Sequence, residues 1–411
     1  MTVLAADVTS TLAELADWHG ERRAHFPALT ADPQLAYLDS SATAQKPQAV
    51  IDAVTEHVSR DHANAGRGNY PWSTAATKLL EVACDRVATF IGDTQRRGSV
   101  ALTAGASAGL RAVALDWLLH DARSGDEIIV PAADHQANLL PWLEAQALSR
   151  ARGVDLIVHE MPMEKTGSGD YDIDALRALV SPRTRMVAAT HVHHVGGNDM
   201  NLHRIRAVIG DEVVFCVDAA QSVGHLPVDV DRLGADFLVF AGHKAMALPG
   251  IGAVWSRDER TGPFTLGGWA GSPNTTGAAS LIAALDWLSA TDCSLIHRWT
   301  VALGARLTEG LRHLDGIEVI GCQDSLAADS PVQKRQGIVS FTHRDIPARD
   351  LGFVLADRGI LVRADGHCQA RGLDPAPASG TAESVRVSTH VYSAVDEIDR
   401  LLDVLAEVQG R

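Results

Sequence analysis

The sequence lacks a long apolar run and a cationic start. None of its hydrophobic stretches approaches the roughly 20 residues needed to span a bilayer. The opening segment, MTVLAADVTSTLAELADWHG, carries Asp7, Glu14 and Asp17 in place of the basic start of a signal peptide. We therefore expect neither a membrane anchor nor a signal peptide.

Basic residues are scarce relative to acidic ones. The chain has 36 Lys and Arg residues against 51 Asp and Glu residues, which gives a formal net charge of -15. No stretch gathers the basic residues into a patch that would neutralise the phosphates of a nucleic acid. Nucleic acid is therefore not expected as a partner.

Paired cysteines are also missing. No two of the five cysteines form a C-x-x-C motif, and the odd set consists of Cys84, Cys216, Cys293, Cys322 and Cys368. This pattern argues against a disulfide framework and against a zinc ribbon, and it favours a reducing compartment. We therefore expect a cytoplasmic protein.

What is present is the composition of a folded protein of more than one domain. Hydrophobic residues make up 46% of the 411 residues and charged residues 21%, far from the signature of disorder. Apolar runs of about five residues alternate with stretches of helical period, which is typical of parallel strands joined by helices. The best strand candidates are residues 99–103, 127–130, 186–190, 213–217 and 237–240.

The alternation changes near Thr291, where a few strands and a final helix follow. We expect a large α/β domain over residues 36–290 and a smaller α+β domain over residues 291–411, with residues 1–35 packing on the smaller one. The final helix is expected to open at Ser393, with Asp396 as its capping-box partner. Its predicted buried face consists of Val395, Ile398, Leu402 and Leu405.

Two predicted strands end in residues that carry chemistry. VVFCVDAAQS places Asp218 at the end of one strand, and DFLVFAGHK places His243 and Lys244 at the end of another. Ligands gather where parallel strands end. A carboxylate that holds a pyridine nitrogen protonated and an amine that carries an aldehyde are what pyridoxal phosphate (PLP) requires. Each residue alone would also fit a solvated loop, so the pairing carries the argument.

Two further turns follow predicted strands. VALTAGASAGLRAV reads as a strand, a glycine-containing turn and a helix; the free backbone N–H groups of such a turn would suit a phosphate, and Ser107 could add a hydroxyl. Glycine turns before helices are also common for conformational reasons alone. AADHQANLLPW places His135 where an imidazole could stack on a planar ring, although a lone histidine is more often a surface or core residue.

These features together resemble the class V aminotransferase family of fold-type I PLP enzymes, and most closely its Suf-type (group II) cysteine desulfurases and selenocysteine lyases. The resemblance runs from Tyr37 to the final helix. It depends most on YLDSSATAQKP, DHQANLLPW, VDAAQSVGHLPVDV, GHK, AGSPNTTG and RADGHC. It implies a PLP-dependent transferase fold with a large, mostly parallel sheet, and a homodimer.

The resemblance also implies roles around the cofactor. Lys244 would be the Schiff-base lysine, Asp218 the partner of the ring nitrogen and Gln221 a neighbour of the ring hydroxyl, while His135 would stack on the ring. The phosphate would be bound by the turn at Ala106 and Ser107, by His243 and, across the dimer interface, by Ser272.

For the substrate, the resemblance implies that Cys368 accepts sulfur, five residues after Arg363, and we expect Arg363 and His194 to contribute to substrate binding. A loop that carries a histidine and arginines also favours a thiolate. Arg386 would clamp the substrate carboxylate with its fork of donors, and Arg67 would lie at the pocket mouth.

The chain departs from the family around the ligand. His194 stands where the family has an asparagine, Ala241 stands where the family usually has a phosphate-binding serine, and the segment between Trp255 and Ala270 is too short for the family's long hairpin. As metal ligands, the neighbouring histidines lack a carboxylate or thiolate companion, so no metal is expected.

Three functions remain open from the sequence. The first is a cysteine desulfurase that converts L-cysteine, or a related sulfur amino acid, to alanine with a persulfide on Cys368 and then passes the sulfur to an acceptor protein. The second is a PLP-dependent C–S lyase that eliminates the sulfur of an S-substituted cysteine. The third is a non-catalytic scaffold for sulfur transfer.

Overall fold

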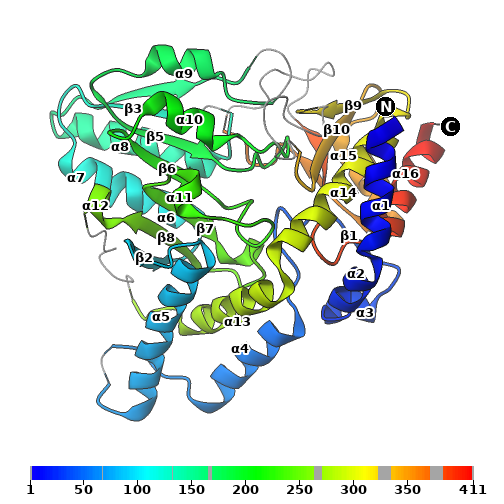
Figure 1. Ribbon diagram of the computed structural model, residues 1–411, viewed down its shortest axis with the longest axis horizontal. Coiled ribbons are helices and arrows are strands. Elements are labelled where there is room, and N and C mark those ends of the chain that lie inside the picture. Colours follow the sequence, from blue (N-terminus) through cyan, green and yellow to red (C-terminus); the bar gives the residue numbers. More distant parts are fainter. Residues whose placement is uncertain are drawn as a thin grey trace.

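In the computed structural model, the described residues are 2–409 apart from 67, 132, 165–168, 263–270, 323–334 and 371–382. The largest element is a seven-stranded sheet in the order β2-β8-β7-β6-β5-β3-β4 (Figure 1). All its pairings from β4 to β7 are parallel, and only β8 runs antiparallel to its neighbours β7 and β2. The strands are β2 (Gly98–Thr103), β3 (Glu127–Pro131), β4 (Ile157–Met161), β5 (Thr184–Thr190), β6 (Val214–Asp218), β7 (Phe237–Ala241) and β8 (Gly252–Arg257).

Helices cover both faces of this sheet, which explains why its central strands are apolar throughout. Successive side chains of a strand point to opposite faces, so Val217 packs into one core and Cys216 into the other. The first core is shared with helices α4 (Gln48–Arg60), α5 (Pro71–Phe90), α9 (Ile173–Leu179), α10 (Leu202–Ile209) and α13 (Thr275–Thr291). The second is shared with α6 (Ala106–Ala112), the π-helical turn η1 (Val113–Leu118) and α8 (Leu140–Ala151).

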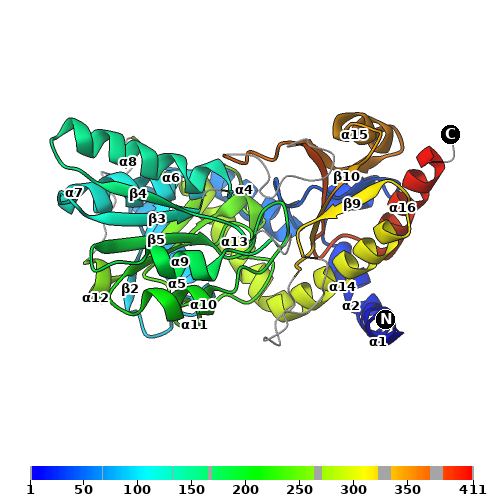
Figure 2. The ribbon, with the colours of Figure 1, turned by 90° about the horizontal axis from the view of Figure 1, so that it is seen from above.

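A second, antiparallel sheet has the strand order β12-β13-β10-β9. Its strands are β9 (Ile317–Ile320), β10 (Ile338–His343), β12 (Arg363–Asp365) and β13 (Ser384–Ser388). Figures 1 and 2 show this sheet beside the large one, together with α14 (Cys293–Arg312), α15 (Ala348–Asp357) and α16 (Val395–Gln409). A separate hydrophobic core joins these elements around Trp299 and Phe341, and Leu12 and Leu15 of the N-terminal segment belong to it.

Shorter elements connect these units. Strand β1 (Ala36–Tyr37) pairs in parallel with β11 (Ile360–Leu361). The remaining helices are α1 (Thr2–Glu14), α2 (Ala16–Arg23), α3 (Pro27–Ala31), α7 (Leu119–Asp121), η2 (Gln136–Asn138), α11 (Val230–Leu233), η3 (Gly242–Lys244) and α12 (Asp258–Thr261). The domain limits at residues 36 and 291 stay predictions. Within the described residues, no single helix is long and apolar enough to cross a membrane, although α13 and α14, bent by 78°, meet those two criteria as a pair.

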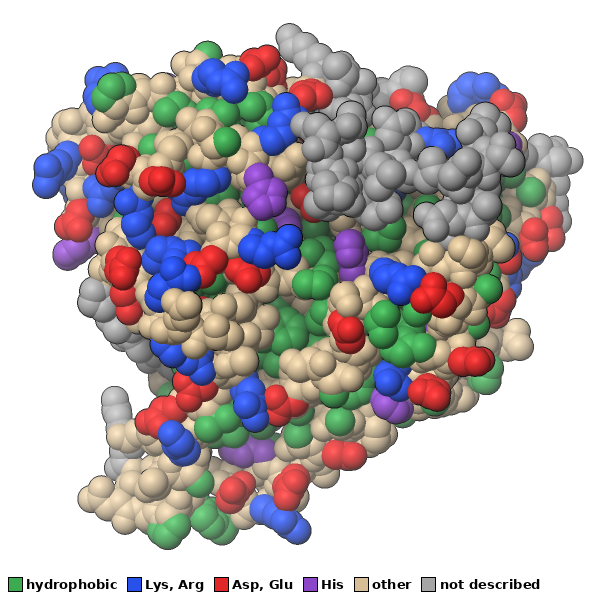
Figure 3. All heavy atoms as spheres, in the orientation of Figure 1, with side chains coloured by type: hydrophobic (Ala, Val, Ile, Leu, Met, Phe, Trp, Pro, Cys, Tyr) green, Lys and Arg blue, Asp and Glu red, His purple; other side chains and the backbone are tan. Residues whose placement is uncertain are grey.

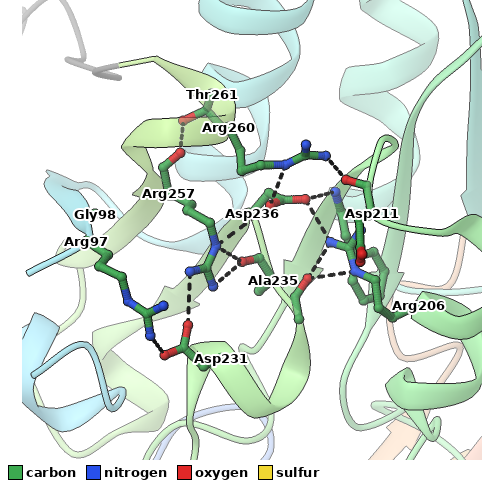
Figure 4. A network of polar contacts seen from close by, with 12 residues as sticks. Arg97, Gly98, Arg206, Asp211, Asp231, Ala235, Asp236, Arg257, Arg260 and Thr261 are labelled. Atoms are coloured by element: carbon green, nitrogen blue, oxygen red, sulfur yellow. Dashed lines mark hydrogen bonds and ion pairs between the residues drawn. The ribbon is translucent and has the colours of Figure 1, made fainter. Parts of the chain in front are cut away.

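The strand directions place two different polar networks at the two edges of the large sheet. Strands β5, β6 and β7 end at Thr190, Asp218 and Ala241, so the segments that follow them meet at one edge. At the opposite edge, directly before β7, Asp236 lies among arginines (Figure 4). On the face shown in Figure 3, basic and acidic side chains are interspersed. The first edge, next to the small sheet, contains the candidate site.

Candidate active site

Lys244 closely follows β7, in the short helix η3, and the residue is largely covered. Desolvation, helped by the charges of Arg386 and Arg363, lowers the pKa of its amine to about 8. Asp218 acts in the opposite direction. An amine that is partly deprotonated near neutral pH can both form a bond to an aldehyde and exchange a proton.

Asp218 ends β6 and is buried, with one carboxylate oxygen accepting a hydrogen bond from Ala220 N–H at 2.9 Å. Burial raises the pKa of this carboxyl to about 6, which Lys244 partly offsets. Gln221 lies three residues on, where its Nε2 donates to Ser41 O at 3.1 Å and its buried Oε1 has no partner among the described residues. A positive ring nitrogen and a ring hydroxyl would satisfy these two acceptors.

His135 opens the segment after β3. Its Nδ1 accepts a hydrogen bond from Ala137 N–H at 3.1 Å, so the neutral ring carries its proton on Nε2. Burial lowers its pKa to about 4, with further contributions from Lys244 and Arg363. His135 is therefore neutral at pH 7, as a ring that stacks beside a cationic pyridine should be.

The sequence reasoning missed the buried carboxyl beside this histidine. Asp134 accepts a 2.7 Å hydrogen bond from Tyr171 O–H, and the same Tyr171 oxygen accepts one from Thr190 N–H at 3.1 Å. Burial raises the pKa of Asp134 to about 7. The pair ties the segment after β3 to the end of β5. Its only sequence signal is an acidic residue next to His135 in the DHQANLLPW motif.

His194, which replaces the family's asparagine, lies in the same cluster. Its ring centroid is 5.2 Å from that of His135, and its Nε2 is buried without a partner in the described part of the chain. Burial holds the pKa of His194 well below its usual range, and the neighbouring His193 and His135 contribute. His194 is therefore a neutral ring with one nitrogen available to a ligand.

The predicted phosphate contacts are only partly brought together. Gly105 has φ 136°, a backbone that favours glycine, and leads into Ala106 and the exposed Ser107 at the start of α6. A side chain at Gly252 would clash with Gly105 and with Phe240 O, so glycine is needed there. Half-buried His243 lies at the same sheet edge.

Three further positions singled out in the sequence are the predicted phosphate contact Ser272, the serine replacement Ala241 and the pocket-mouth residue Arg67. Ser272 is exposed in the segment before α13. Ala241 is buried at the end of β7, where its methyl group offers no hydrogen bond. Arg67 lies outside the described residues.

Arg386 lies in β13 of the small sheet and is almost fully buried. Its Nη1 donates to His194 O and its Nη2 to Asp39 Oδ1, both at 3.1 Å. Its Nε is buried and has no partner among the described residues. A buried guanidinium with an unused donor is suited to a carboxylate ligand. Asp39 was not predicted, although it stands within the YLDSSATAQKP motif.

Cys368 lies in the turn after β12, and Arg363 Nη2 donates a hydrogen bond to its sulfur at 3.1 Å. The turn docks on the His135 segment, where Gln136 N–H donates to Cys368 O at 2.9 Å and Ala370 N–H donates to Asp134 O at 3.2 Å. Cys368 also contributes to the electrostatics of Lys244. The small sheet therefore brings a thiol to the same site as the amine.

These residues fit PLP together with an amino-acid substrate. Gln221 Oε1, His194 Nε2 and Arg386 Nε are buried without partners among the described residues, and such atoms require a polar ligand. Lys244, Asp218, Gln221 and His135 would hold the cofactor. No group of His, Cys, Asp or Glu side chains in the described segments could hold a metal ion.

The comparisons with known proteins agree with this arrangement. The family model described as Aminotransferase class-V matches residues 36–401, and the chain belongs to this family, whose members use PLP. A protein of Vibrio cholerae serotype O1 named probable cysteine desulfurase is 33% identical over 408 residues, covering 92% of this chain and 96% of the relative. A cysteine desulfurase of Klebsiella pneumoniae is also 33% identical, covering 94% of this chain and 97% of the relative.

The chain is also similar to solved structures of cysteine desulfurases. The apo cysteine desulfurase of Thermococcus onnurineus NA1 superposes with a TM-score of 0.82 at 30% identity, covering 94% of this chain and 97% of that one. The cysteine desulfurase CsdA of Escherichia coli has a TM-score of 0.79 at 29% identity, covering 95% and 99%. The predicted fold class, with its large and mostly parallel sheet, is confirmed.

The buried histidines predict how stability depends on pH. Desolvation lowers their pKa values to about 4 for His19, His135, His193, His225 and His243, and to about 3 for His367. Between pH 4 and the ordinary value of 6.5 the unfolded chain binds more protons at these sites, so stability rises with pH there. The raised pKa values of Asp39, Asp134, Asp218 and Glu397 oppose this trend, but these carboxyls are fewer than the histidines.

We therefore expect the urea midpoint of the cofactor-free protein to be higher at about pH 6.5 than at about pH 5. Circular dichroism at each pH measures it. His193→Gln should reduce this difference between the two midpoints. It removes one buried imidazole, and His193 is not among the residues assigned to the cofactor. A midpoint that is equal at both pH values, or higher at pH 5, would contradict this prediction.

Proposed function

We propose that the protein is a PLP-dependent cysteine desulfurase that converts L-cysteine to alanine and holds the sulfur on Cys368. The observation that carries this proposal is the meeting of Cys368, bound by Arg363, with Lys244 and the carboxylate-binding Arg386 at one sheet edge. An amine alone would fit many PLP reactions. A thiol delivered from the other sheet fits sulfur transfer.

In this mechanism the protein residues bind, orient and move protons. Arg386 would hold the substrate carboxylate through Nε, and His135 and His194 would remain neutral beside it. Bound PLP supplies an electron sink that activates Cα and Cβ of the substrate. Lys244, with a pKa of about 8, would take the proton from Cα and return it later.

The Cys368 thiolate would then attack the substrate sulfur. A sulfur–sulfur bond forms as the substrate Cβ–S bond breaks, and the electron pair of the broken bond stays with Cβ, which takes a proton and becomes the methyl group of alanine. Cysteine and the enzyme thiol thereby give alanine and the enzyme persulfide, with no external oxidant or reductant. Arg363 beside the sulfur would stabilise the thiolate before the attack.

The test is Cys368→Ser. We expect alanine formation from cysteine to fall more than about a hundredfold, because the attacking sulfur is lost. Mass spectrometry should show 32 Da added to the wild-type Cys368 peptide after cysteine treatment, about the mass of one sulfur atom. The absorbance of bound cofactor serves as the control for an intact site. Alanine production that survives the substitution would contradict the proposal.

A C–S lyase acting on an S-substituted cysteine is the second candidate. His194, which replaces the family's asparagine, favours this lyase function. Its buried Nε2 has no partner among the described residues, and an imidazole could assist a larger leaving group. The same variant separates the two functions, because an eliminase should keep releasing pyruvate without Cys368. A non-catalytic scaffold is not supported, since Lys244, Asp218 and His135 are brought together.

We further propose that the protein is a homodimer, that it passes sulfur to an acceptor protein and that it resides in the cytoplasm. Exposed Ser272 supports the dimer, as do exposed apolar side chains on α4 and at the start of α5, namely Ile51, Val58, Tyr70 and Trp72. All five cysteines are free, which supports a reducing compartment. Light scattering would test the dimer.

A further inference from the structure

Two arginines face each other between the edge strand β12 of the small sheet and its neighbour β13. Arg363 of β12 and Arg386 of β13 are register partners in an antiparallel pair. Like charges directly opposite each other are destabilising unless each has its own counter-ion. Asp39 supplies the counter-ion of Arg386, at 3.1 Å, and Asp365 supplies that of Arg363.

The contact between Arg363 and Asp365 is a fork. Residues two apart on a strand share a face, so β12 places the two side chains together. Arg363 Nε donates to Asp365 Oδ1 at 2.8 Å, and Nη2 donates to Oδ2 at 3.0 Å. Nη2 also carries the hydrogen bond to Cys368 sulfur at 3.1 Å. The fork that would grip a substrate carboxylate is therefore already occupied.

Asp365 also shapes the turn that carries the thiol. His367 and Cys368 have φ values of 51° and 59°, a left-handed conformation that costs energy for residues other than glycine. Asp365 Oδ1 accepts a 2.7 Å hydrogen bond from His367 N–H and lies 3.2 Å from His367 Nδ1. His367 Nε2 in turn lies 2.8 Å from Ser384 Oγ on β13.

We propose that Asp365 is a positioning residue that commits Arg363 to the Cys368 thiolate and thereby leaves the substrate carboxylate to Arg386. This inference rests on the proposed desulfurase function for its catalytic meaning. The arrangement itself, a carboxylate that fixes an arginine on a thiol, is independent of that function. Asp365 thus separates the roles of the two facing arginines: Arg363 binds the thiolate and Arg386 binds the substrate carboxylate.

The first measurement follows the thiol and needs no turnover. Iodoacetamide labelling of Cys368 in the holoenzyme, monitored by peptide mass spectrometry, should become about tenfold slower in Asp365→Asn, because a charge-assisted hydrogen bond to the sulfur is lost. Arg363→Met, which keeps the apolar stem, should slow labelling by the same factor. The double variant should be no slower than either single variant, because both changes remove one interaction.

The matched control is Glu383→Gln. Glu383, directly before β13, binds Arg349 of α15 through contacts of 2.7 to 3.1 Å, but at a more exposed position. Its substitution should leave the labelling rate unchanged. Thermal melting of every variant shows that the fold is kept. Effects of Asp365→Asn and Arg363→Met that multiply in the double variant would overturn the proposal, since Asp365 would then act only on the turn.

The second measurement separates the two arginines with cysteine as substrate. In Asp365→Asn, kcat should fall about tenfold while KM changes less than about twofold, because the carboxylate clamp is untouched. A rise in KM with kcat unchanged would overturn the division of tasks. If no variant, and not even the wild type, makes alanine, the desulfurase function fails, whereas the labelling result still decides the role of Asp365.

Discussion

Replacing Lys244 by alanine is expected to lower alanine formation from cysteine about a thousandfold or more, which is the size of a lost proton-transfer group and covalent anchor. The reason is its position. Lys244 lies where β7 ends, its pKa is lowered to about 8 by desolvation, and Asp218 lies at the end of the neighbouring strand. The measurement is alanine release under saturating cysteine, together with the spectrum of the bound cofactor.

The chain offers a matched control for this experiment. Lys46 is a second lysine whose pKa desolvation lowers to about 8, and its amine binds backbone carbonyls, including His243 O at 3.3 Å. Lys46→Met should affect stability more than chemistry, with turnover kept within about tenfold. If Lys244→Ala kept turnover at that level, the assignment of the amine would be wrong. A large loss in Lys46→Met alone would point to the other lysine.

The scaffold of the site could be predicted because strand ends are visible in a sequence. The predicted strands at 127–130 and 237–240 lie within one residue of β3 and β7, and the residues that follow them meet at one sheet edge. Apolar runs that end in a charged residue carry this information, since a buried charge is too costly without a partner or a ligand. Lys244, Asp218, His135 and Gln221 therefore came from local patterns and from the resemblance.

The partners of those residues could not be predicted, because they come from distant parts of the chain. Asp39 reaches Arg386 across 347 positions, and Tyr171 reaches Asp134 across 37. Isolated polar residues of this kind produce no periodic pattern in the sequence that would reveal their contacts. Asp365 was visible in RADGHC, but its fork with Arg363 depends on a two-residue strand spacing within β12, which the sequence did not show.

The final helix shows the limit of local rules. Its capping carboxylate is Glu397, which accepts a hydrogen bond from Ala394 N–H at 2.9 Å and also pairs with Arg23, so the prediction of Asp396 is wrong by one residue. Ile398 and Leu405 are buried as predicted, while Val395 and Leu402 are only partly buried and Leu401 and Val404 join the core instead. Periodicity alone does not determine which face of α16 is buried, because that face depends on how α16 packs against α14.

Replacing Asp236 by alanine is expected to lower the free energy of unfolding by about 3 to 5 kcal/mol, because it leaves buried donors without an acceptor. Asp236 accepts from Arg206 Nη2 at 2.7 Å and from Phe215 N–H at 2.9 Å (Figure 4). Arg260 Nε and Arg257 Nε lie 3.5 and 3.8 Å from its other oxygen. One carboxylate therefore joins the starts of β6 and β7 to arginines at the end of β8 and in α12.

Urea denaturation monitored by circular dichroism measures this loss. The control is Glu56→Gln, which breaks an exposed pair with Arg60 on α4 and should change stability by less than about 0.5 kcal/mol. Because Asp236 lies at the sheet edge opposite Lys244, the folded fraction of Asp236→Ala should keep its affinity for cofactor and its kcat. If the variant is as stable as the wild type, water replaces Asp236 as the acceptor for the arginines, and the stability prediction is wrong. If kcat falls in the folded protein, the two edges of the sheet are coupled.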